Sequence, residues 1–356
     1  MSESFSIAIP CRADEPALSI TLESLAMACQ WSHLSQEHVV ELLVCINGVK
    51  KEQECVPLVA VRKFCHEHQM GCTEVWLTND GRPMRNVELP EKRIPAPNWQ
   101  AKVERGLDSD FIQATASNGP KDTRTTPFPS CTVLLTERRG KPPAWNILWR
   151  WAKGDLVLFT DADVWIDPAA VFYLYTCLRQ GPMLQLVAAR EVPAAVERET
   201  LWSRMAAISY RFNFGNAGGR LFLIRKTALK DGLPEDLLLE DAWLTVAVGR
   251  TSVYKETRAR VFFLPPATRG DYFAERVRTE GGKLQIQRQY PTLLTQGPIA
   301  RYRWCEFWRD LRVTEYPLVA LSLFIRLLAR GWAWTQIRHR DFYSLYRPFT
   351  STKQWK

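Results

Sequence analysis

The sequence predicts an α/β protein built on a mainly parallel mixed sheet that is flanked by helices, with a helical extension at the C-terminus. Along residues 5–290, short apolar runs typical of buried strands alternate with segments whose apolar residues follow helical spacing. This alternation favours parallel pairing, because consecutive parallel strands need a crossover helix. The 356 residues are 46% hydrophobic and 24% charged, a composition that supports a substantial core and argues against a disordered chain.

Each predicted element carries its own local signal. Strands are indicated by short apolar runs that polar or turn-forming residues bound. These runs cover residues 5–10, 39–46, 74–77, 131–136, 156–160, 184–189, 221–224 and 260–264. Helices are indicated by apolar residues at helical spacing, and one helix has Pro168 in its first turn. These segments cover residues 15–30, 53–68, 143–152, 168–178, 237–249 and 272–290.

Residues 1–290 are expected to form one domain that contains a long insertion. Residues 79–130 are rich in Pro, Asn, Asp and Arg and show little periodicity. A stretch of this length without periodicity indicates an insertion that is partly mobile. Residues 291–356 are expected to form a separate C-terminal region that is basic, aromatic-rich and helical.

The cysteines and the N-terminus favour a cytoplasmic location. The nine cysteines are scattered, odd in number and without a C-x-x-C pair, which is typical of reduced, mostly buried thiols and offers no zinc site. The N-terminus lacks the basic segment and the long apolar stretch of a signal peptide. The protein is therefore expected to face the cytoplasm.

The net charge of +9 is concentrated near the C-terminus. Residues 301–356 contain eleven Lys or Arg and four Asp or Glu, a net charge of +7. Large apolar residues recur there at helical spacing among arginines, as in a helix that lies in a membrane interface. They are Tyr302, Trp304, Phe307, Trp308 and Leu311.

The strongly apolar residues 318–329 contain Arg326 and are short for a membrane span, which needs about 20 residues. We therefore expect the C-terminal region to lie on a membrane surface, at the inner face, so that the protein is cytoplasmic and peripheral. A solvated basic face and a helical subdomain packed on the core are the alternatives. No recognised nucleic-acid module is present, so nucleic acid is not an expected partner.

A pair of carboxylates follows one predicted strand. The apolar residues 156–160 lead directly into Asp161 and Asp163. Ligands of α/β sheets bind at the carboxyl ends of parallel strands, and two carboxylates there can hold a divalent cation that bridges to a diphosphate. By itself, the pair is equally compatible with a turn that caps the helix beginning near Pro168.

A second acidic pair, Glu240 and Asp241, lies in the helix predicted over residues 237–249. In isolation, such a pair is typical of a helix N-terminus, where the macrodipole favours negative charge. In this sequence it follows Asp163 by about eighty residues.

The two acidic pairs, in this order, resemble those of the family 2 glycosyltransferases, which have the GT-A (Rossmann-like) fold. The resemblance extends from about residue 5 to residue 290. It implies an inverting transfer of a sugar from a UDP- or GDP-sugar to an acceptor hydroxyl. The C-terminal region, and not the resemblance, suggests a lipid-linked acceptor, and a polysaccharide is the alternative. The resemblance also implies Mg²⁺ or Mn²⁺ at Asp163, with Asp161 orienting the metal or the ribose. Asp241, beside Glu240, is then the catalytic base.

The same resemblance implies a set of substrate-binding residues. The first strand and the loop after it are similar to the nucleotide-contacting part of the family, and Asn47 stands where the family commonly has an acidic residue. Arg288 lies in a segment that resembles the Gln-x-x-Arg-Trp element of membrane-associated synthases, without the tryptophan. The expected set is Pro10, Arg12, Glu15, Asn47, Lys141, Asn146, Asp161, Gly218, Gly219 and Arg288.

Two other classes of function are compatible with parts of the sequence. A nucleotidyltransferase or another nucleotide-binding α/β enzyme would use a similar sheet, although the loop after residue 10 has no glycine-rich phosphate-binding pattern. A catalytically silent membrane-binding module would use the C-terminal region alone, and the intact acidic pairs argue against it.

Overall fold

The computed structural model describes residues 3–32, 40–50, 54–84, 128–195, 199–210, 218–294 and 311–336. Most of the predicted insertion and four of the five interfacial residues, namely Tyr302, Trp304, Phe307 and Trp308, lie outside these residues. The eight described cysteines are all free thiols, and six of them are buried. The expectation of reduced, mostly buried thiols is therefore confirmed for the described part of the chain.

The described residues form one nine-stranded sheet in the order β3-β4-β2-β1-β5-β8-β7-β9-β6. The strands are β1 (Phe5–Arg12), β2 (Val40–Asn47), β3 (Gly71–Trp76), β4 (Ser130–Thr136), β5 (Leu156–Thr160), β6 (Val164–Ile166), β7 (Leu186–Pro193), β8 (Leu221–Arg225) and β9 (Val253–Phe263). The pairs among β1, β2, β3, β4 and β5 are parallel, and so is the pair of β7 with β9. β8 is antiparallel to β5 and β7, and β6 is antiparallel to β9. The predicted mainly parallel mixed sheet is confirmed.

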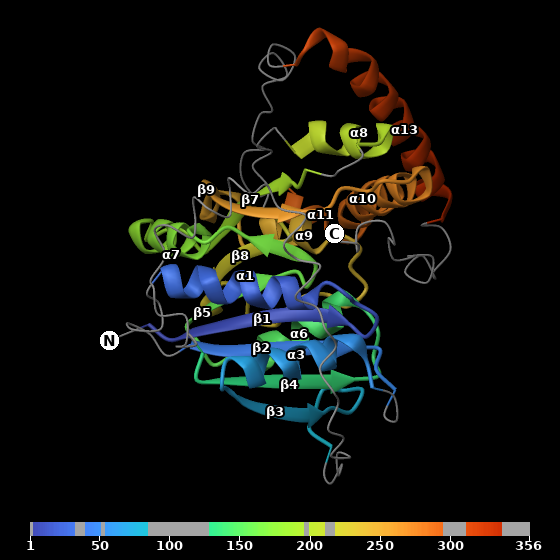
Figure 1. The fold of residues 1–356 in the computed structure, drawn as a ribbon. Helices are drawn as coiled ribbons and strands as arrows, with labels where there is room; N and C mark the ends of the chain where they lie inside the picture. Colours follow the sequence, from blue (N-terminus) through green and yellow to red (C-terminus); the bar gives the residue numbers. More distant parts are fainter. Residues whose placement is uncertain are drawn as a thin grey trace.

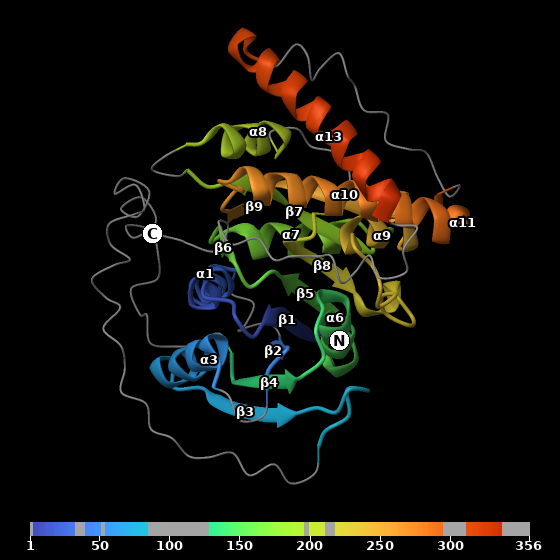
Figure 2. The same cartoon turned by 90° about the vertical axis from the view of Figure 1, so that its right-hand side faces the viewer.

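Helices cover both faces of this sheet (Figures 1 and 2). They are α1 (Leu18–Trp31), α3 (Val56–Glu67), α6 (Lys141–Trp151), α7 (Ala170–Gln180), α8 (Leu201–Tyr210), α9 (Glu240–Ala247), α10 (Arg269–Gln289), α11 (Pro291–Leu294) and α13 (Tyr316–Gln336). Short 3-10 turns lie at Lys226–Ala228, Arg250–Ser252 and Val313–Glu315.

Two apolar cores follow from the alternation of side chains along the strands. In β5, Leu156 and Leu158 pack in the core shared with α1, α3 and α7, whereas Val157 and Phe159 pack in the core shared with α6 and α9. Successive side chains of a strand point to opposite faces, so an apolar run without alternation is what a sheet covered on both faces requires. In the second core, Trp145 stacks on Phe159 with ring centroids 4.4 Å apart.

The register brings the ends of several strands to one edge of the sheet. Arg12 pairs with Asn47 and Asn47 pairs with Thr136, so β1, β2 and β4 end together. β8 runs the opposite way, and its first residue, Leu221, pairs with Thr160 at the end of β5. The loops after β1, β2, β4 and β5 and the loop before β8 therefore share this edge, where ligands of α/β sheets bind.

The C-terminal helix α13 lies across α10 and α8, beyond the β7 and β9 end of the sheet (Figures 1 and 2). The hydroxyls of Tyr272 in α10 and Ser322 in α13 lie 2.8 Å apart in a buried hydrogen bond. Within the described residues, one stretch, Val313–Gln336, is long and apolar enough to cross a membrane by length and composition alone. The predicted helical extension is present, and one of its faces packs on the rest of the protein.

Some element bounds differ from the predicted ones for local reasons. α9 begins at Glu240 instead of residue 237, because Gln285 Oε1 accepts a 3.0 Å hydrogen bond from the backbone N–H of Leu238 and holds that segment outside the helix. α7 begins after Pro168, because Asp167 Oδ1 accepts a bond from the N–H of Ala169 and forms a turn there. The helix α8 and the short strand β6 were not predicted.

Candidate active site

The two predicted acidic pairs meet at this edge of the sheet. Asp161 and Asp163 follow the end of β5, and the backbone N–H of Asp161 donates to the carbonyl oxygen of Arg220 at 2.9 Å. This hydrogen bond ties the turn to the residue that precedes β8. Glu240 and Asp241 are the first two residues of α9.

Lys141 joins the two acidic pairs. It is the first residue of α6 and follows Gly140, whose φ of 117° lies in the region that favours glycine. The Nζ atom of Lys141 lies 2.7 Å from Asp161 Oδ1 and 2.5 Å from Glu240 Oε1. One ammonium group therefore holds together carboxylates that are 79 residues apart in the chain.

The charges of Lys141, Asp161 and Glu240 stabilise one another. Burial acts to lower the pKa of Lys141, but the charges of Asp161 and Glu240 outweigh it and hold that pKa above its usual value. Burial acts to raise the pKa of Glu240, but the charges of Lys141 and Arg278 outweigh it and lower that pKa. Lys141 is therefore a cation and Glu240 an anion at neutral pH.

Asp241 differs from its neighbour. Burial, followed by the negative charges of Glu240 and Glu191, raises the pKa of Asp241 to about 6. Its Oδ1 accepts a 2.8 Å hydrogen bond from the backbone N–H of Ala242, which opposes this shift. A carboxylate with this pKa is ionised at neutral pH and is still basic enough to accept a proton.

Two glycines keep the space beside these carboxylates open. A Cβ atom at Gly219 would lie 3.2 Å from Asp241 Cβ, and a Cβ atom at Gly218 would lie 3.1 Å from Glu191 Cδ. Contacts this short are rare for real Cβ atoms, so side chains at these two positions would crowd the carboxylates. The structure brings Gly219, one of the predicted substrate-binding residues, next to the predicted base.

Arg220 and Glu191 belong to the site and were not among the predicted residues. Arg220 Nε lies 3.5 Å from Glu191 Oε1, and its guanidinium carbon lies 3.8 Å from the ring centroid of Phe263. Burial acts to lower the pKa of Arg220, but the surrounding acidic groups, led by Tyr210, hold it above its usual value. The sequence does contain a signal for Glu191, since a charged pair follows the apolar run 184–189 just as Asp161 and Asp163 follow the run 156–160. In the structure, β7 ends at the same edge of the sheet as β5.

We call Asp161, Asp163, Glu191, Glu240 and Asp241 the carboxylate cluster. Lys141 and Arg220 supply its basic side chains, and both of them act on Asp161 by their charge. The cluster combines a pair of carboxylates at a strand end with a separate carboxylate of raised pKa. This combination can bind a cation or a phosphate-bearing ligand on one side and accept a proton on the other.

Arg12 and Asn47, predicted to contact the nucleotide, lie side by side in the sheet register. The buried Asn47 donates from Nδ2 to the carbonyl oxygen of Cys11 at 2.9 Å, so its side chain holds the end of β1. Arg12 is partly exposed and pairs with Asp14 at 2.5 Å.

Pro10 and Glu15, which were also predicted to contact the nucleotide, are buried. Pro10 lies within β1, and Glu15 is 4% exposed. Glu15 Oε1 accepts a 3.2 Å hydrogen bond from the backbone N–H of Ala17, just before α1. These contacts shape the loop after β1.

Asn146 and Arg288 complete the predicted substrate-binding set. Asn146 donates from Nδ2 to the carbonyl oxygen of Leu233 and accepts at Oδ1 from the N–H of Leu233, both at 2.7 Å. Its amide therefore holds the segment before α9. Arg288 is exposed near the end of α10, and the arginine of this helix whose charge lowers the pKa of Glu240 is Arg278.

The carboxylates suit a divalent cation that arrives with a phosphate ligand. Within the described residues, no group of three or more His, Cys, Asp or Glu side chains could hold a metal ion by itself. Mg²⁺ and its relatives take hard oxygen ligands, and Mg²⁺ usually takes one or two protein carboxylates together with phosphate oxygens and water. Asp161 and Asp163 can supply these one or two protein carboxylates.

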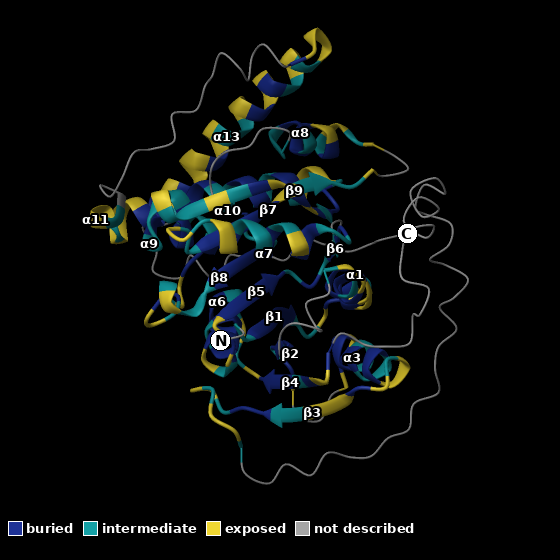
Figure 3. Cartoon of the chain, turned by 90° about the vertical axis from the view of Figure 1, so that its left-hand side faces the viewer, coloured by how far each residue is buried: buried dark blue, intermediate teal, exposed yellow. Residues whose placement is uncertain are grey.

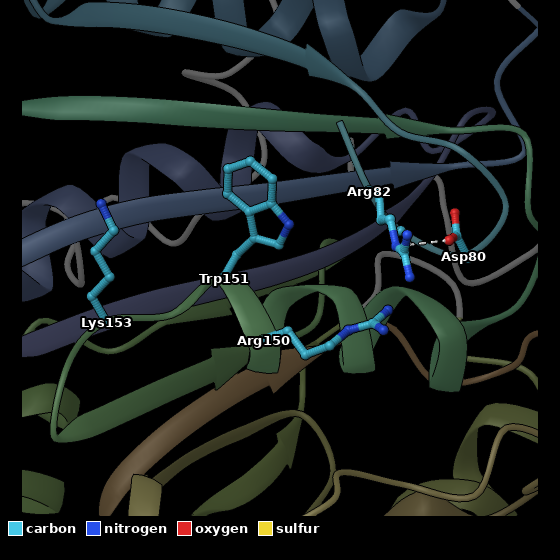
Figure 4. Close-up of a pocket in the computed structure, with 6 residues that line it drawn as sticks. Asp80, Arg82, Arg150, Trp151 and Lys153 are labelled. Carbon is cyan, nitrogen blue, oxygen red and sulfur yellow. Dashed lines mark ion pairs between the residues drawn. The ribbon is translucent and has the colours of Figure 1, made fainter. Parts of the chain in front are cut away.

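Two surface hollows lie apart from the carboxylate cluster. One has a volume of about 740 Å³ and is lined by Asn79, Asp80, Glu137 and Arg138. The other has a volume of about 630 Å³ and is shown in Figure 4; Asp80 and Arg82 pair at its rim at 3.1 Å, and Arg150 points toward them. Neither hollow is lined by a residue of the carboxylate cluster. We therefore identify the candidate site from the charged side chains of the cluster and not from these hollows.

Relatives among curated and solved proteins include several glycosyltransferases. A segment covering 46% of the chain is 28% identical to the poly-β-1,6-N-acetyl-D-glucosamine synthase of Staphylococcus epidermidis, and it spans 44% of that protein. Among solved structures, the mannosyltransferase PcManGT from Pyrobaculum calidifontis, in complex with GDP-Man and Mn²⁺, has a TM-score of 0.49 at 13% identity. That similarity covers 98% of this chain and 82% of that one. S. aureus TarS has a TM-score of 0.42 at 14% identity, over 96% of this chain and 54% of that one.

The family comparison matches the part of the chain that contains Lys141, Asp161 and Asp163. Residues 122–233 match the family model of Glycosyl transferase family 2. This part of the chain is therefore similar to glycosyl transferase family 2, the family that the motifs in the sequence resemble.

Proposed function

We propose that this protein is an inverting glycosyltransferase that transfers a sugar from a nucleotide-diphosphate sugar to an acceptor hydroxyl. The observation that carries the proposal is the position of Lys141 between Asp161 and Glu240, at 2.7 Å and 2.5 Å. This contact brings the turn after β5, which we assign to the sugar donor, and the start of α9, which we assign to the acceptor, into one site. A turn that merely caps a helix would not need that contact.

The donor side consists of Asp161, Asp163 and Lys141. A divalent ion, Mg²⁺ or Mn²⁺, bound at Asp163 with the help of Asp161 would offset the negative charge that the diphosphate gains as it leaves. Lys141 adds a second positive charge there, and its raised pKa keeps that charge at neutral pH. Arg12 and Asn47 end neighbouring strands. We propose that the partly exposed Arg12 faces the nucleotide and that the buried Asn47 supports this edge by holding the end of β1.

The acceptor side consists of Asp241 and the glycines beside it. Asp241 accepts the proton of the acceptor hydroxyl while that oxygen forms its bond to the anomeric carbon, and the bond from that carbon to the diphosphate breaks. The diphosphate leaves with the electron pair. With a single base and no carboxylate nucleophile, one displacement inverts the anomeric centre. The pKa of about 6 suits Asp241 for this part at neutral pH.

The acceptor is proposed to be a lipid-linked or polysaccharide hydroxyl. The name of the Staphylococcus epidermidis relative, a poly-β-1,6-N-acetyl-D-glucosamine synthase, supports a polysaccharide. The long apolar helix α13 supports an acceptor that is held at a membrane, with the enzyme at its cytoplasmic face.

The test is release of nucleoside diphosphate from a panel of UDP- and GDP-sugars by the purified full-length protein. We expect release with Mg²⁺ or Mn²⁺, loss of release with EDTA, and at least about a hundredfold lower release for Asp163→Asn. A matched control is Asp231→Asn, which changes an exposed aspartate in the loop before α9.

Full activity of Asp163→Asn, or an unchanged rate in EDTA, would contradict the proposed donor side. Exchange of pyrophosphate into a nucleoside triphosphate, in place of sugar transfer, would indicate a nucleotidyltransferase.

A further inference from the structure

We propose that the outward face of α13 is a membrane-docking surface that lies flat on an anionic phospholipid bilayer, with the helix axis parallel to the membrane plane. The inference builds on the proposed membrane position of the enzyme and not on its chemistry. It is carried by the residues of α13, by the contacts of this helix with α8 and α10, and by the charge of the C-terminal region.

The outward face of α13 is apolar along most of the helix. Leu327 is 69% exposed, and Phe324 and Trp332 are each 57% exposed. The helix is drawn with yellow, exposed turns in Figure 3, whereas the strands of the central sheet are mostly dark blue. We call this surface the apolar face, and it comprises Leu323, Phe324, Leu327, Leu328, Trp332 and Trp334.

Both arginines of α13 have partners on the helices that α13 packs against. Arg326 Nη2 donates to Ser209 Oγ in α8 at 3.3 Å, and Arg330 Nη1 lies 3.3 Å from Glu280 Oε2 in α10. A helix on the surface of a water-soluble protein turns its apolar stripe inward and its charges outward. In α13, Arg326 is partly buried against α8, and Arg330, whose side chain is 45% exposed, is held by Glu280 of α10. The large apolar side chains lie outside, which fits the interface of a membrane.

Contacts along α13 decide between lying on the bilayer and crossing it. The helix has 21 residues and is about 30 Å long, enough by length to cross. Crossing would carry Arg326 and Arg330 into the hydrocarbon or pull α8 and α10 in with them, and charged groups are costly there. With the axis in the membrane plane, both arginines and Ser322 keep their partners.

Charge favours a bilayer over a second copy of the chain as the partner of the apolar face. Residues 301–356 carry a net charge of +7, and Arg312, just before α13, is exposed. Anionic lipid headgroups attract such a region, whereas two copies that meet face to face would bring two regions of like charge together. An apolar face with basic neighbours is the pattern of an interfacial helix.

The test is co-sedimentation of the purified full-length protein with vesicles of phosphatidylcholine alone or mixed with phosphatidylglycerol. We expect binding to the mixed vesicles, and a partition coefficient lowered by about tenfold or more in the double variant Phe324→Glu and Leu327→Glu. The matched control is Met183→Glu, because Met183 is 77% exposed in the loop after α7. It should bind as the wild type does.

Equal binding of the double variant and the wild type would overturn the proposal. If the wild type sediments as a dimer without vesicles and the double variant as a monomer, the apolar face is a subunit interface and the proposal is wrong. The variant Asp241→Asn should bind vesicles normally, so that loss of transfer and loss of membrane binding are distinguished.

Hydrogen exchange on vesicle-bound protein tests the orientation. If α13 stays docked and lies flat, exchange slows in α13 and does not change in α8 and α10. Faster exchange in α8 and α10 on binding would show that α13 leaves them, and would overturn the flat orientation.

Discussion

Replacing Asp241 by asparagine should abolish sugar transfer and, at neutral pH, make the protein more stable. The two effects have one cause, the raised pKa of this carboxyl group. The environment that makes Asp241 a useful base also disfavours its ionised form, mainly through burial and then through Glu240 and Glu191. Asparagine has nearly the same shape and can still accept the hydrogen bond from Ala242 that Asp241 accepts at 2.8 Å.

The sign and size of the stability change follow from the pKa. The folded-state pKa of Asp241 is raised from 3.8 to about 6, so the folded protein prefers the protonated form. Ionised Asp241 therefore destabilises the fold increasingly as pH rises from about 4 to about 6, and by a constant amount above that. Two units correspond to about 3 kcal/mol, which we reduce to about 2 kcal/mol because the side chain is partly exposed.

The assay is thermal unfolding of wild type and Asp241→Asn at about pH 7.5 and about pH 4, with donor turnover measured in parallel. At the higher pH the variant should unfold about 2–4 °C above the wild type, and at the lower pH the two should agree closely. Turnover should fall by at least about a hundredfold. Asp231→Asn, the exposed control, should change neither quantity.

Two results would refute this reasoning. An unfolding temperature of Asp241→Asn equal to or below that of the wild type at neutral pH would mean that the carboxyl group is not destabilised as described. Full turnover would mean that Asp241 is not the base. A less stable but inactive variant would separate the two parts and leave only the catalytic assignment standing.

Two further changes test the surroundings of Asp241. Glu191→Gln removes a negative charge that raises the pKa of Asp241. The acid limb of the pH profile of kcat should therefore move to lower pH by about half a unit, with the donor KM unchanged. An unchanged pH profile would show that Glu191 does not act on the base. Gly219→Ala places a Cβ about 3.2 Å from Asp241 Cβ, so kcat should fall by about tenfold or more with little effect on the donor KM. Steady-state kinetics measures this change. A kcat equal to that of the wild type would show that the backbone around residue 219 moves to accommodate the added methyl group.

Local structure could be predicted well wherever burial leaves a periodic pattern. The apolar run 156–160 became β5, and the carboxylates after it stand at the carboxyl end of a parallel strand, as expected. The start of α9 was misplaced by three residues, because Gln285 holds the preceding segment from a distant helix. Helix propensity along the sequence cannot predict a hydrogen bond from a side chain that is about fifty residues away.

The candidate site was predicted in part, through residue types that stand at strand and helix ends. Asp161, Lys141 and Glu240 do meet. Arg278, which was not predicted, lowers the pKa of Glu240 from the same helix as Arg288, because the packing of α10 decides which of its side chains approach Glu240. Glu191 was missed, since β7 reaches the site only through its antiparallel pairing with β8.

The amino-acid order alone determined which carboxylates and glycines stand at the ends of buried strands, because apolar periodicity marks those ends. Only the tertiary structure decided which charges face one another, that Asp241 has a raised pKa while its neighbour Glu240 has a lowered one, and that Arg326 of α13 faces α8. The reason is physical. Electrostatic free energies depend on distance and on burial, and both arise from packing between segments that are far apart in the chain.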